Sequence, residues 1–253
     1  MNPIQKRYFG IPHIYLDIVD STNSYAHDVI SKNNPSEGTA ISAGFQTNGR
    51  GQIGRLWEGE ADKNIYTSII LKPSFVKPAD QFLINQAISI GLSEFCRITL
   101  NKVVRIKWPN DIYVRNRKLC GILIQYILSG NTINYGIIGI GVNVNQQNFS
   151  NELHNPTSMI LEKKMVMDIK NLREDLFSSL EYWYEKLKSG EISEIREKYL
   201  SILYRLHEEC IFLVKGKKLT GVIVGVEDQG RLMIKTNSRV EAFSLNELKM
   251  IIE

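Results

Sequence analysis

The sequence contains few of the residues from which metal sites and disulfide frameworks are built. Only three cysteines, Cys96, Cys120 and Cys210, and four histidines occur in 253 residues. None of them forms a C-x-x-C or H-E-x-x-H motif, so a protein-bound metal site is not expected. An odd number of widely spaced cysteines predicts free thiols in a reducing compartment, and we therefore expect a cytoplasmic protein.

Long apolar runs and a strong charge of one sign are also missing from the sequence. No segment approaches the roughly 18 apolar residues of a membrane span, and the first twenty residues lack the apolar core of a signal peptide. The net charge is only +4, below that expected of a dedicated nucleic-acid-binding protein. A non-catalytic nucleotide- or RNA-binding protein remains an alternative, although clustered aromatic residues for base stacking are missing.

The hydrophobic share of 43% is that of an ordinary globular protein, and its pattern predicts an α+β fold. Strands are expected over residues 11–19, 38–46, 64–71, 103–108, 111–114, 119–128 and 132–144. Helices are expected over 23–32, 78–98, 171–188 and 191–206. Because strand often follows strand directly, we expect a mixed or antiparallel sheet with flanking helices. Four further short strands predict a small β-barrel or sandwich, which divides the chain into domains 1–206 and 207–253.

The first motif is a glycine-rich basic stretch, FQTNGRGQIGRLW, in which Gly49, Gly51 and Gly54 have the spacing G-x-G-x-x-G. In a dinucleotide-binding turn the third glycine begins a helix that holds the pyrophosphate. Here an acidic turn and a predicted strand follow instead, which argues against a Rossmann fold. The glycines allow close backbone approach to a ligand, and Arg50 and Arg55 provide planar donors for phosphate or carboxylate. A basic hairpin loop without a ligand would share this pattern.

Three further segments place polar residues beside turns or bare backbone. RIKWPNDIYV has Lys107 before a Trp-Pro-Asn turn and Asp111 after it. These opposite charges suit a site that binds an anion and accepts a proton, although a surface ion pair would look the same. RNRKLCGIL places Lys118 at the start of an apolar strand, where its side chain can emerge at the end of a sheet. GIGVNVN places Asn143 among glycines of another strand.

The chain resembles the biotin–protein ligases, or biotin–[acetyl-CoA-carboxylase] ligases, in five segments with the same order and spacing: STN, QTNGRGQIGRLW, KWPNDIYV, RKLCGILI and GIGVNVN. The resemblance covers most of the chain, continuing through NPTSM to GVIVGVEDQGRLMI, which is similar to that family's SH3-like domain. It implies a class II synthetase-like catalytic domain followed by an SH3-like β-barrel. With no more than about twenty residues before Ser21, the chain resembles the ligase-only type without an N-terminal DNA-binding domain.

The resemblance implies a two-step reaction that uses biotin, ATP and Mg²⁺. The carboxylate of biotin attacks the α-phosphate of MgATP, which gives biotinyl-5′-AMP and pyrophosphate. The biotinyl group then passes to a lysine of a biotin carboxyl carrier domain of a biotin-dependent carboxylase. A lipoate or octanoyl ligase of similar fold is the nearest alternative. The related transferases need a cysteine nucleophile, whereas Cys120 is expected mid-strand, facing the core. No DNA or membrane partner is expected, and a monomer or a homodimer is compatible with the sequence.

The resemblance also implies roles for individual residues. Those expected to contact biotin are Ser21, Thr22, Asn23, Gln46, Gly49, Arg50, Gly51, Gln52, Lys118 and Gly121. Those expected to contact ATP are Arg50, Arg55, Trp57, Lys107, Asn110, Lys118 and Asn143. The catalytic residues are expected to be Lys118, which would bridge the biotin carboxylate and the α-phosphate, with Lys107, Arg50 and Asp111. Of these, Asp111 would accept or orient the proton of the incoming lysine.

Two positions depart from the family's pattern. Gln52 stands where many members have a second arginine, so retention of the adenylate is expected to depend more on Arg50 and Arg55. Gln125 stands where an acid is expected, and a carboxylate role is therefore not carried over to this position. We expect the glycine-rich stretch to close as a lid over the activated biotin.

Overall fold

The computed structural model describes residues 7–52, 54–237 and 239–252, and its larger part is built on one mixed β-sheet. The strand order is β1-β2-β3-β7-β6-β5-β4. Among the described strands, β1 and β2 are parallel and the other neighbours are antiparallel. The expectation of a mixed sheet is confirmed. The strands are β1 (His13–Val19), β2 (Ala40–Gln46), β3 (Asn64–Leu71), β4 (Arg105–Lys107), β5 (Asp111–Val114), β6 (Arg117–Ser129) and β7 (Thr132–Asn143).

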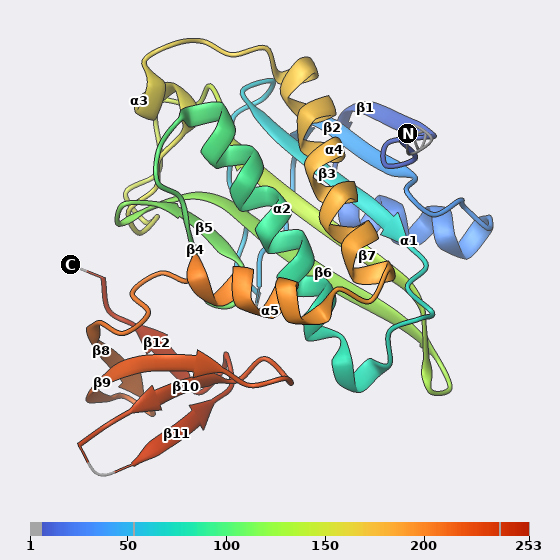
Figure 1. The fold of residues 1–253 in the computed structure, drawn as a ribbon. Helices are drawn as coiled ribbons and strands as arrows, with labels where there is room; N and C mark the ends of the chain where they lie inside the picture. Colours follow the sequence, from blue (N-terminus) through green and yellow to red (C-terminus); the bar gives the residue numbers. More distant parts are fainter. Residues whose placement is uncertain (1–6, 53, 238, 253) are drawn as a thin grey trace, which may run out of the picture.

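Helices cover both faces of this sheet (Figure 1). α2 and α4 lie side by side over one face, and α1 lies on the other. Because α2 is apolar around most of its circumference, most of its side chains are buried in the main core. The helices are α1 (Thr22–Lys32), α2 (Phe82–Leu100), which a single 3₁₀ turn precedes, α3 (Met159–Lys163), α4 (Ile169–Lys188) and α5 (Ile192–Ser201). No helix within the described ranges is long and apolar enough to cross a bilayer.

The structure differs from the expected elements at two helices. α5 ends at Ser201 rather than at residue 206, because the following residues pair with β4. Ile106 N–H donates to the Ile202 carbonyl over 2.9 Å, and Tyr204 N–H donates to the Ile106 carbonyl over 2.8 Å. The short helix α3 was not predicted, since a single turn of helix carries no hydrophobic periodicity.

The C-terminal part is a five-stranded antiparallel sheet with the order β11-β10-β9-β8-β12. Its strands are β8 (Glu209–Val214), β9 (Lys217–Val226), β10 (Leu232–Lys235), β11 (Val240–Phe243) and β12 (Leu248–Met250). The expected closure into a barrel is not observed, because β11 and β12 are short strands at opposite edges with no pairing between their described residues. The three-residue strand β12 was not predicted.

The two sheets are joined at the Trp-Pro-Asn turn that separates β4 from β5. The indole N–H of Trp108 donates to the carbonyl of Gly230, between β9 and β10, over 2.8 Å. Tyr199 O–H, from α5, donates to the carbonyl of Pro109 over 2.7 Å and holds the same turn against the helix. Trp108 is buried in this contact. The contact therefore fixes the C-terminal sheet against the segment that carries Lys107 and Asp111.

All three cysteines are free and buried. Cys120 lies within β6 and is fully buried, as expected for a core side chain. Burial raises the pKa of its thiol well above the ordinary value, so this cysteine is poorly suited to act as a nucleophile.

Candidate active site

A cavity of about 730 Å³ brings together the motifs that the sequence analysis singled out. Its wall combines the start of α1, the glycine-rich stretch after β2, strands β5 to β7, the 149–156 loop and the C-terminal segment. The predicted site residues that line it are Ser21, Thr22, Asn23, Gln46, Arg50, Gly51, Gln52, Arg55, Trp57, Lys107, Asp111, Lys118, Gly121 and Asn143.

A hydrogen-bonded network fixes the polar side chains at one end of the cavity. Gln46 Oε1 accepts from Thr22 N–H over 2.8 Å and lies 3.1 Å from Thr22 Oγ1. Ser68 Oγ lies 2.7 Å from Thr22 Oγ1 and 2.6 Å from Asn23 Oδ1. Asn23 Nδ2 in turn donates to Gln125 Oε1 over 3.0 Å. The network therefore sets the orientation of the Asn23 and Gln46 amides in the ligand-free protein. Neither Ser68 nor Gln125 was predicted as a site residue.

The middle of the cavity is a trough of strand glycines on which the Trp57 ring and the Asn23 side chain pack directly. A Cβ atom at Gly141 would lie 2.3 Å from the ring of Trp57, and one at Gly121 would lie 2.7 Å from the same ring. A Cβ atom at Gly139 would lie 2.2 Å from Asn23 Oδ1. Any larger residue at these positions would displace Trp57 or Asn23. The trough therefore depends on glycine at all three positions, of which the sequence analysis named Gly121.

Two buried polar atoms on the cavity wall have no hydrogen-bond partner within the described chain: the indole Nε1 of Trp57 and Oδ1 of Asn143. The side-chain amide of Asn143 is fixed in orientation, because its Nδ2 donates to the carbonyl of Thr157 over 2.9 Å. Buried polar atoms are normally paired. This donor and this acceptor are therefore suited to bind polar atoms of a ligand.

Three charged side chains meet at the other end of the cavity. Lys118 Nζ lies 2.7 Å from Asp111 Oδ1, and these side chains are 31% and 25% exposed. Lys107 is more enclosed, with its Nζ 5.8 Å from the centre of the Tyr113 ring. Burial lowers the pKa of Lys107; the charge of Asp111 opposes this shift, whereas that of Lys118 adds to it. An anionic ligand would therefore be attracted to this end, because it would offset the repulsion between the two lysines.

The glycine-rich stretch after β2 forms a narrow hairpin. Arg50 and Leu56 form an antiparallel bridge, and Trp57 N–H donates to the carbonyl of Gly49 over 2.8 Å. The side chains of Arg50 and Arg55 are exposed. The hairpin therefore places two arginines at the mouth of the cavity, close to the lysines within it.

Gly49 and Asn110, although predicted as contact residues, are not part of the cavity wall. A Cβ atom at Gly49 would lie 2.5 Å from the carbonyl oxygen of Trp57, so glycine is needed there for the hairpin to close. Asn110 is buried, and its Oδ1 accepts from Gln52 Nε2 over 2.7 Å. The two residues support the hairpin in the structure, and direct ligand contact stays a prediction.

The sequence analysis missed two parts of the cavity wall. One is the 149–156 loop, and the other is the end of the C-terminal sheet. In the second, Lys249 adds a positive charge that further lowers the pKa of Lys107. Apart from Asn155 and Pro156, which begin the NPTSM segment of the resemblance, no motif marks either part, because their position depends on how the C-terminal sheet and the loop pack against the main sheet. The missed residues include Phe149, Glu152, Leu153, His154, Leu213, Lys249, Met250, Ile251 and Ile252.

Comparison with known proteins agrees with the resemblance found in the sequence. The bifunctional ligase/repressor BirA of Bacillus subtilis is 29% identical over 234 residues, which cover 90% of this chain and 70% of that protein. The biotin–[acetyl-CoA-carboxylase] ligase of Mycobacterium tuberculosis is 24% identical over 244 residues, covering 92% and 88% of the two chains. The structure of the biotin protein ligase from Aquifex aeolicus in complex with biotin and ATP has a TM-score of 0.80 and 28% identity, covering 95% and 99%.

Two family models match the chain over separate regions. The C-terminal region, residues 206–248, matches the biotin protein ligase C terminal domain. Residues 15–143, which contain the glycine-rich stretch and both lysine segments, match the model of the biotin/lipoate A/B protein ligase family. The chain belongs to the biotin/lipoate A/B protein ligase family.

Proposed function

We propose that this protein is an ATP-dependent biotin–protein ligase that forms biotinyl-5′-AMP and transfers the biotinyl group to a carrier lysine. The observation that carries the proposal is the single cavity in which a fixed polar end and a glycine trough lead to a cluster of cations. Three segments far apart in the sequence supply these cations. The proposal is supported by relatives that are named as biotin ligases and by the similar structure with biotin and ATP.

Biotin matches the cavity, in which a polar end, a glycine trough and a cationic end follow one another. Its ureido group would bind at the polar end, where the amides of Asn23 and Gln46 are held in place. Its ring and aliphatic chain would lie along the glycine trough beside the Trp57 ring that packs there, and its carboxylate would point to Lys118. A largely apolar pocket with a few fixed polar groups is the usual design of a small-molecule site. This polar end also favours biotin over lipoate, whose dithiolane ring makes no comparable hydrogen bonds.

The first step joins two anions, so cations must offset their repulsion. A carboxylate oxygen of biotin attacks the α-phosphorus, the bond to the bridging oxygen breaks, and pyrophosphate leaves. Lys118 would contact both the carboxylate and the α-phosphate, whereas Lys107, Arg50 and Arg55 would contact the phosphates. Phosphate binding would favour the charged form of Lys107, which burial disfavours in the ligand-free protein.

Mg²⁺ would enter this site as part of the substrate MgATP. Within the described residues there is no cluster of three or more histidine, cysteine or acidic side chains that could hold a metal ion. The chain therefore offers positive charge to the nucleotide, and the phosphates themselves would provide the main ligands of the ion.

The second step needs a neutral amine on the carrier lysine. This amine attacks the acyl carbon of biotinyl-5′-AMP, AMP leaves with the electrons of the broken bond, and the nitrogen loses a proton. Asp111 is the acidic side chain next to Lys118, at 2.7 Å, and we assign to it the role of accepting or orienting that proton. The acceptor would be a biotin carboxyl carrier domain of a biotin-dependent carboxylase.

A direct acylation assay tests this function. The protein is incubated with MgATP and a biotin carrier domain, together with either biotin or lipoate, and the carrier is weighed by mass spectrometry. We expect biotinylation of one lysine and none on a carrier in which that lysine is replaced by arginine. Lipoylation without biotinylation would support the alternative ligase, and no acylation with either acid would refute the proposal.

A further inference from the structure

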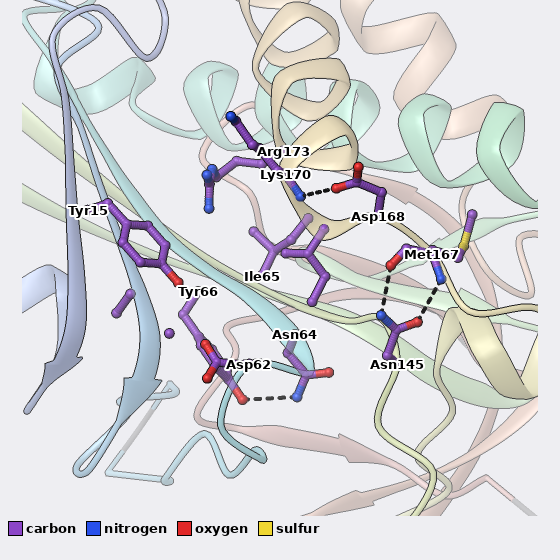
Figure 2. A pocket seen from close by; sticks show the side chains of 13 residues that line it. Tyr15, Asp62, Asn64, Ile65, Tyr66, Asn145, Met167, Asp168, Lys170 and Arg173 are labelled. Carbon is purple, nitrogen blue, oxygen red and sulfur yellow. Dashed lines mark hydrogen bonds between the residues drawn. The ribbon is translucent and has the colours of Figure 1, made fainter.

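A second cavity, of about 550 Å³, lies on the face of the main sheet that α4 covers (Figure 2). It is formed by β1, β2, the start of β3 and the first turns of α4. Ile65, Met167 and Ile169 give it an apolar side. None of the residues that line it belongs to the biotin and ATP site proposed above.

Arg173 is the positively charged group buried in the wall of this cavity. Its residue is only 9% exposed, and its Nε is buried without a hydrogen-bond partner. Across residues 7–52, 54–237 and 239–252, the guanidinium makes no ion pair. It makes a cation–π contact with Tyr15, in which the Arg173 Cζ lies 5.2 Å from the centre of the ring. Figure 2 shows the side chain extending from α4 towards Tyr15 across the cavity. A ring face offsets a buried charge only in part.

Two of the nearby carboxylates are engaged elsewhere. Asp168 accepts from the backbone N–H groups of Lys170 and Asn171 and so caps α4. Glu174 forms an ion pair with Arg7. A buried guanidinium is normally matched by a carboxylate or phosphate. Asp62 also lines the cavity, but it forms no ion pair with Arg173, so among the described residues the guanidinium has no carboxylate bonded to it.

The amide side chains of the cavity are also satisfied. Asn145 Nδ2 donates to the Met167 carbonyl over 2.8 Å, and Met167 N–H donates to Asn145 Oδ1 over 3.0 Å. Asn64 Nδ2 lies 2.9 Å from the hydroxyl of Tyr66. These bonds hold the walls in place, and the Nε of Arg173 is the buried side-chain donor of the cavity that has no partner among the described residues.

We infer that this cavity binds a small aliphatic carboxylate, with its carboxylate on the Arg173 guanidinium and its hydrocarbon part against Ile65, Met167 and Ile169. The planar donor fork of arginine matches a carboxylate in two parallel hydrogen bonds. An inorganic anion would fill only part of the cavity volume and would leave the apolar side without a contact. A carboxylate with a short hydrocarbon chain satisfies both the charge and the apolar surface.

Titration calorimetry with sodium butyrate, acetate and phosphate, at constant ionic strength, tests the inference. Arg173→Met removes the guanidinium while keeping an unbranched side chain, and Arg97→Met, at an exposed position of α2, is the matched control. We expect butyrate to bind more tightly than acetate or phosphate. Its affinity should fall roughly tenfold or more in Arg173→Met, as for loss of a charged hydrogen bond, and stay unchanged in Arg97→Met.

Two further measurements separate a ligand site from a role of Arg173 in folding. Without carboxylate, Arg173→Met should unfold close to the wild-type temperature, because the substitution relieves a buried charge and loses only the contact with the Tyr15 ring. Arg173→Lys, which keeps the charge but not the planar fork, should bind butyrate less tightly than the wild type. Equal butyrate binding by wild type and Arg173→Met, or absence of binding by the wild type, would overturn the inference. Biotinylation activity should be the same in Arg173→Met and wild type, so this test is independent of the proposed function.

Discussion

Replacing Lys118 by alanine should slow the formation of biotinyl-5′-AMP by about 100- to 1,000-fold. The basis is the position of its ammonium group, 2.7 Å from Asp111 and at the end of the trough where the carboxylate and the α-phosphate would meet. Removing one preorganised group that stabilises a developing anion costs about 2.7–4 kcal/mol in the transition state. Neighbouring Lys107 would not replace it, because its ammonium group is more enclosed and sits beside the Tyr113 ring.

The same substitution should leave the fold nearly unchanged. The ion pair with Asp111 is partly exposed, and such pairs contribute about 0–1 kcal/mol to stability. The backbone of Lys118 keeps its bonds in the variant: its N–H donates to the Asn155 carbonyl over 2.7 Å, and its carbonyl accepts from Thr157 N–H over 2.8 Å. The unfolding temperature should therefore change little while the first step is almost lost.

Pyrophosphate release in the presence of biotin and MgATP measures the first step. Transfer from chemically prepared biotinyl-5′-AMP to the carrier domain measures the second step separately. We expect Lys118→Ala to slow adenylate formation far more than biotinyl transfer. Lys235→Ala, at an exposed position of β10, should slow neither step. Pyrophosphate release near the wild-type rate in Lys118→Ala would refute the role assigned to this lysine.

Three further substitutions test the surroundings of the site. Gln52→Ala removes the 2.7 Å bond to Asn110 and should speed dissociation of biotinyl-5′-AMP roughly 3- to 10-fold, equivalent to about 0.5–1.5 kcal/mol; an unchanged rate in a filter-binding assay would contradict this. Gln125→Leu leaves the amide of Asn23 without its 3.0 Å partner, so biotin should bind more weakly by about 1–3 kcal/mol, whereas calorimetry on Gln125→Glu should show a smaller loss. Lys107→Met should unfold at an equal or higher temperature near neutral pH but bind MgATP less tightly. Burial lowers the pKa of Lys107 from its usual 10.5. The loss of folding stability caused by its buried charge is therefore greatest at pH values below the folded-state pKa, and it declines as the pH rises towards 10.5. The stability difference between Lys107→Met and wild type should therefore shrink in alkaline thermal melts, and a constant difference would contradict the assignment.

Most of the site could be predicted from the sequence because its residues lie in short rigid segments. Lys107, Asp111 and Lys118 flank turns and strand ends, where the chain has little freedom, and all three line one cavity. The parts that could not be predicted depend on contacts between distant segments. Lys249 reaches the cavity because the C-terminal sheet packs against the main part, through contacts that include the bond between Trp108 and Gly230. Neither residue carries a local pattern that indicates this contact.

The partner of Asp111 shows the same limit at a finer scale. The sequence placed Lys107 and Asp111 on either side of one turn, and the two are indeed opposite each other in the β4–β5 pair. The carboxylate nevertheless pairs with Lys118. The pairing of β5 with β6 shifts between Ile112 and Tyr113, and a bulge of this kind changes the direction of nearby side chains. A one-residue shift in register is not visible in residue type or spacing.

Gln52 joins the electrostatics of the site to the stability of the hairpin. An arginine at this position would bring a further positive charge to a site where Lys118, Arg55 and Lys249 already lower the pKa of Lys107. Glutamine adds no charge, yet its amide still links the hairpin to Asn110 in the segment that carries Lys107. A hydrogen bond between two neutral amides is screened far less by salt than an ion pair. Closure of this hairpin over the adenylate should therefore depend on ionic strength through Arg50 and Arg55 alone, and Gln52→Arg should make it more sensitive to salt.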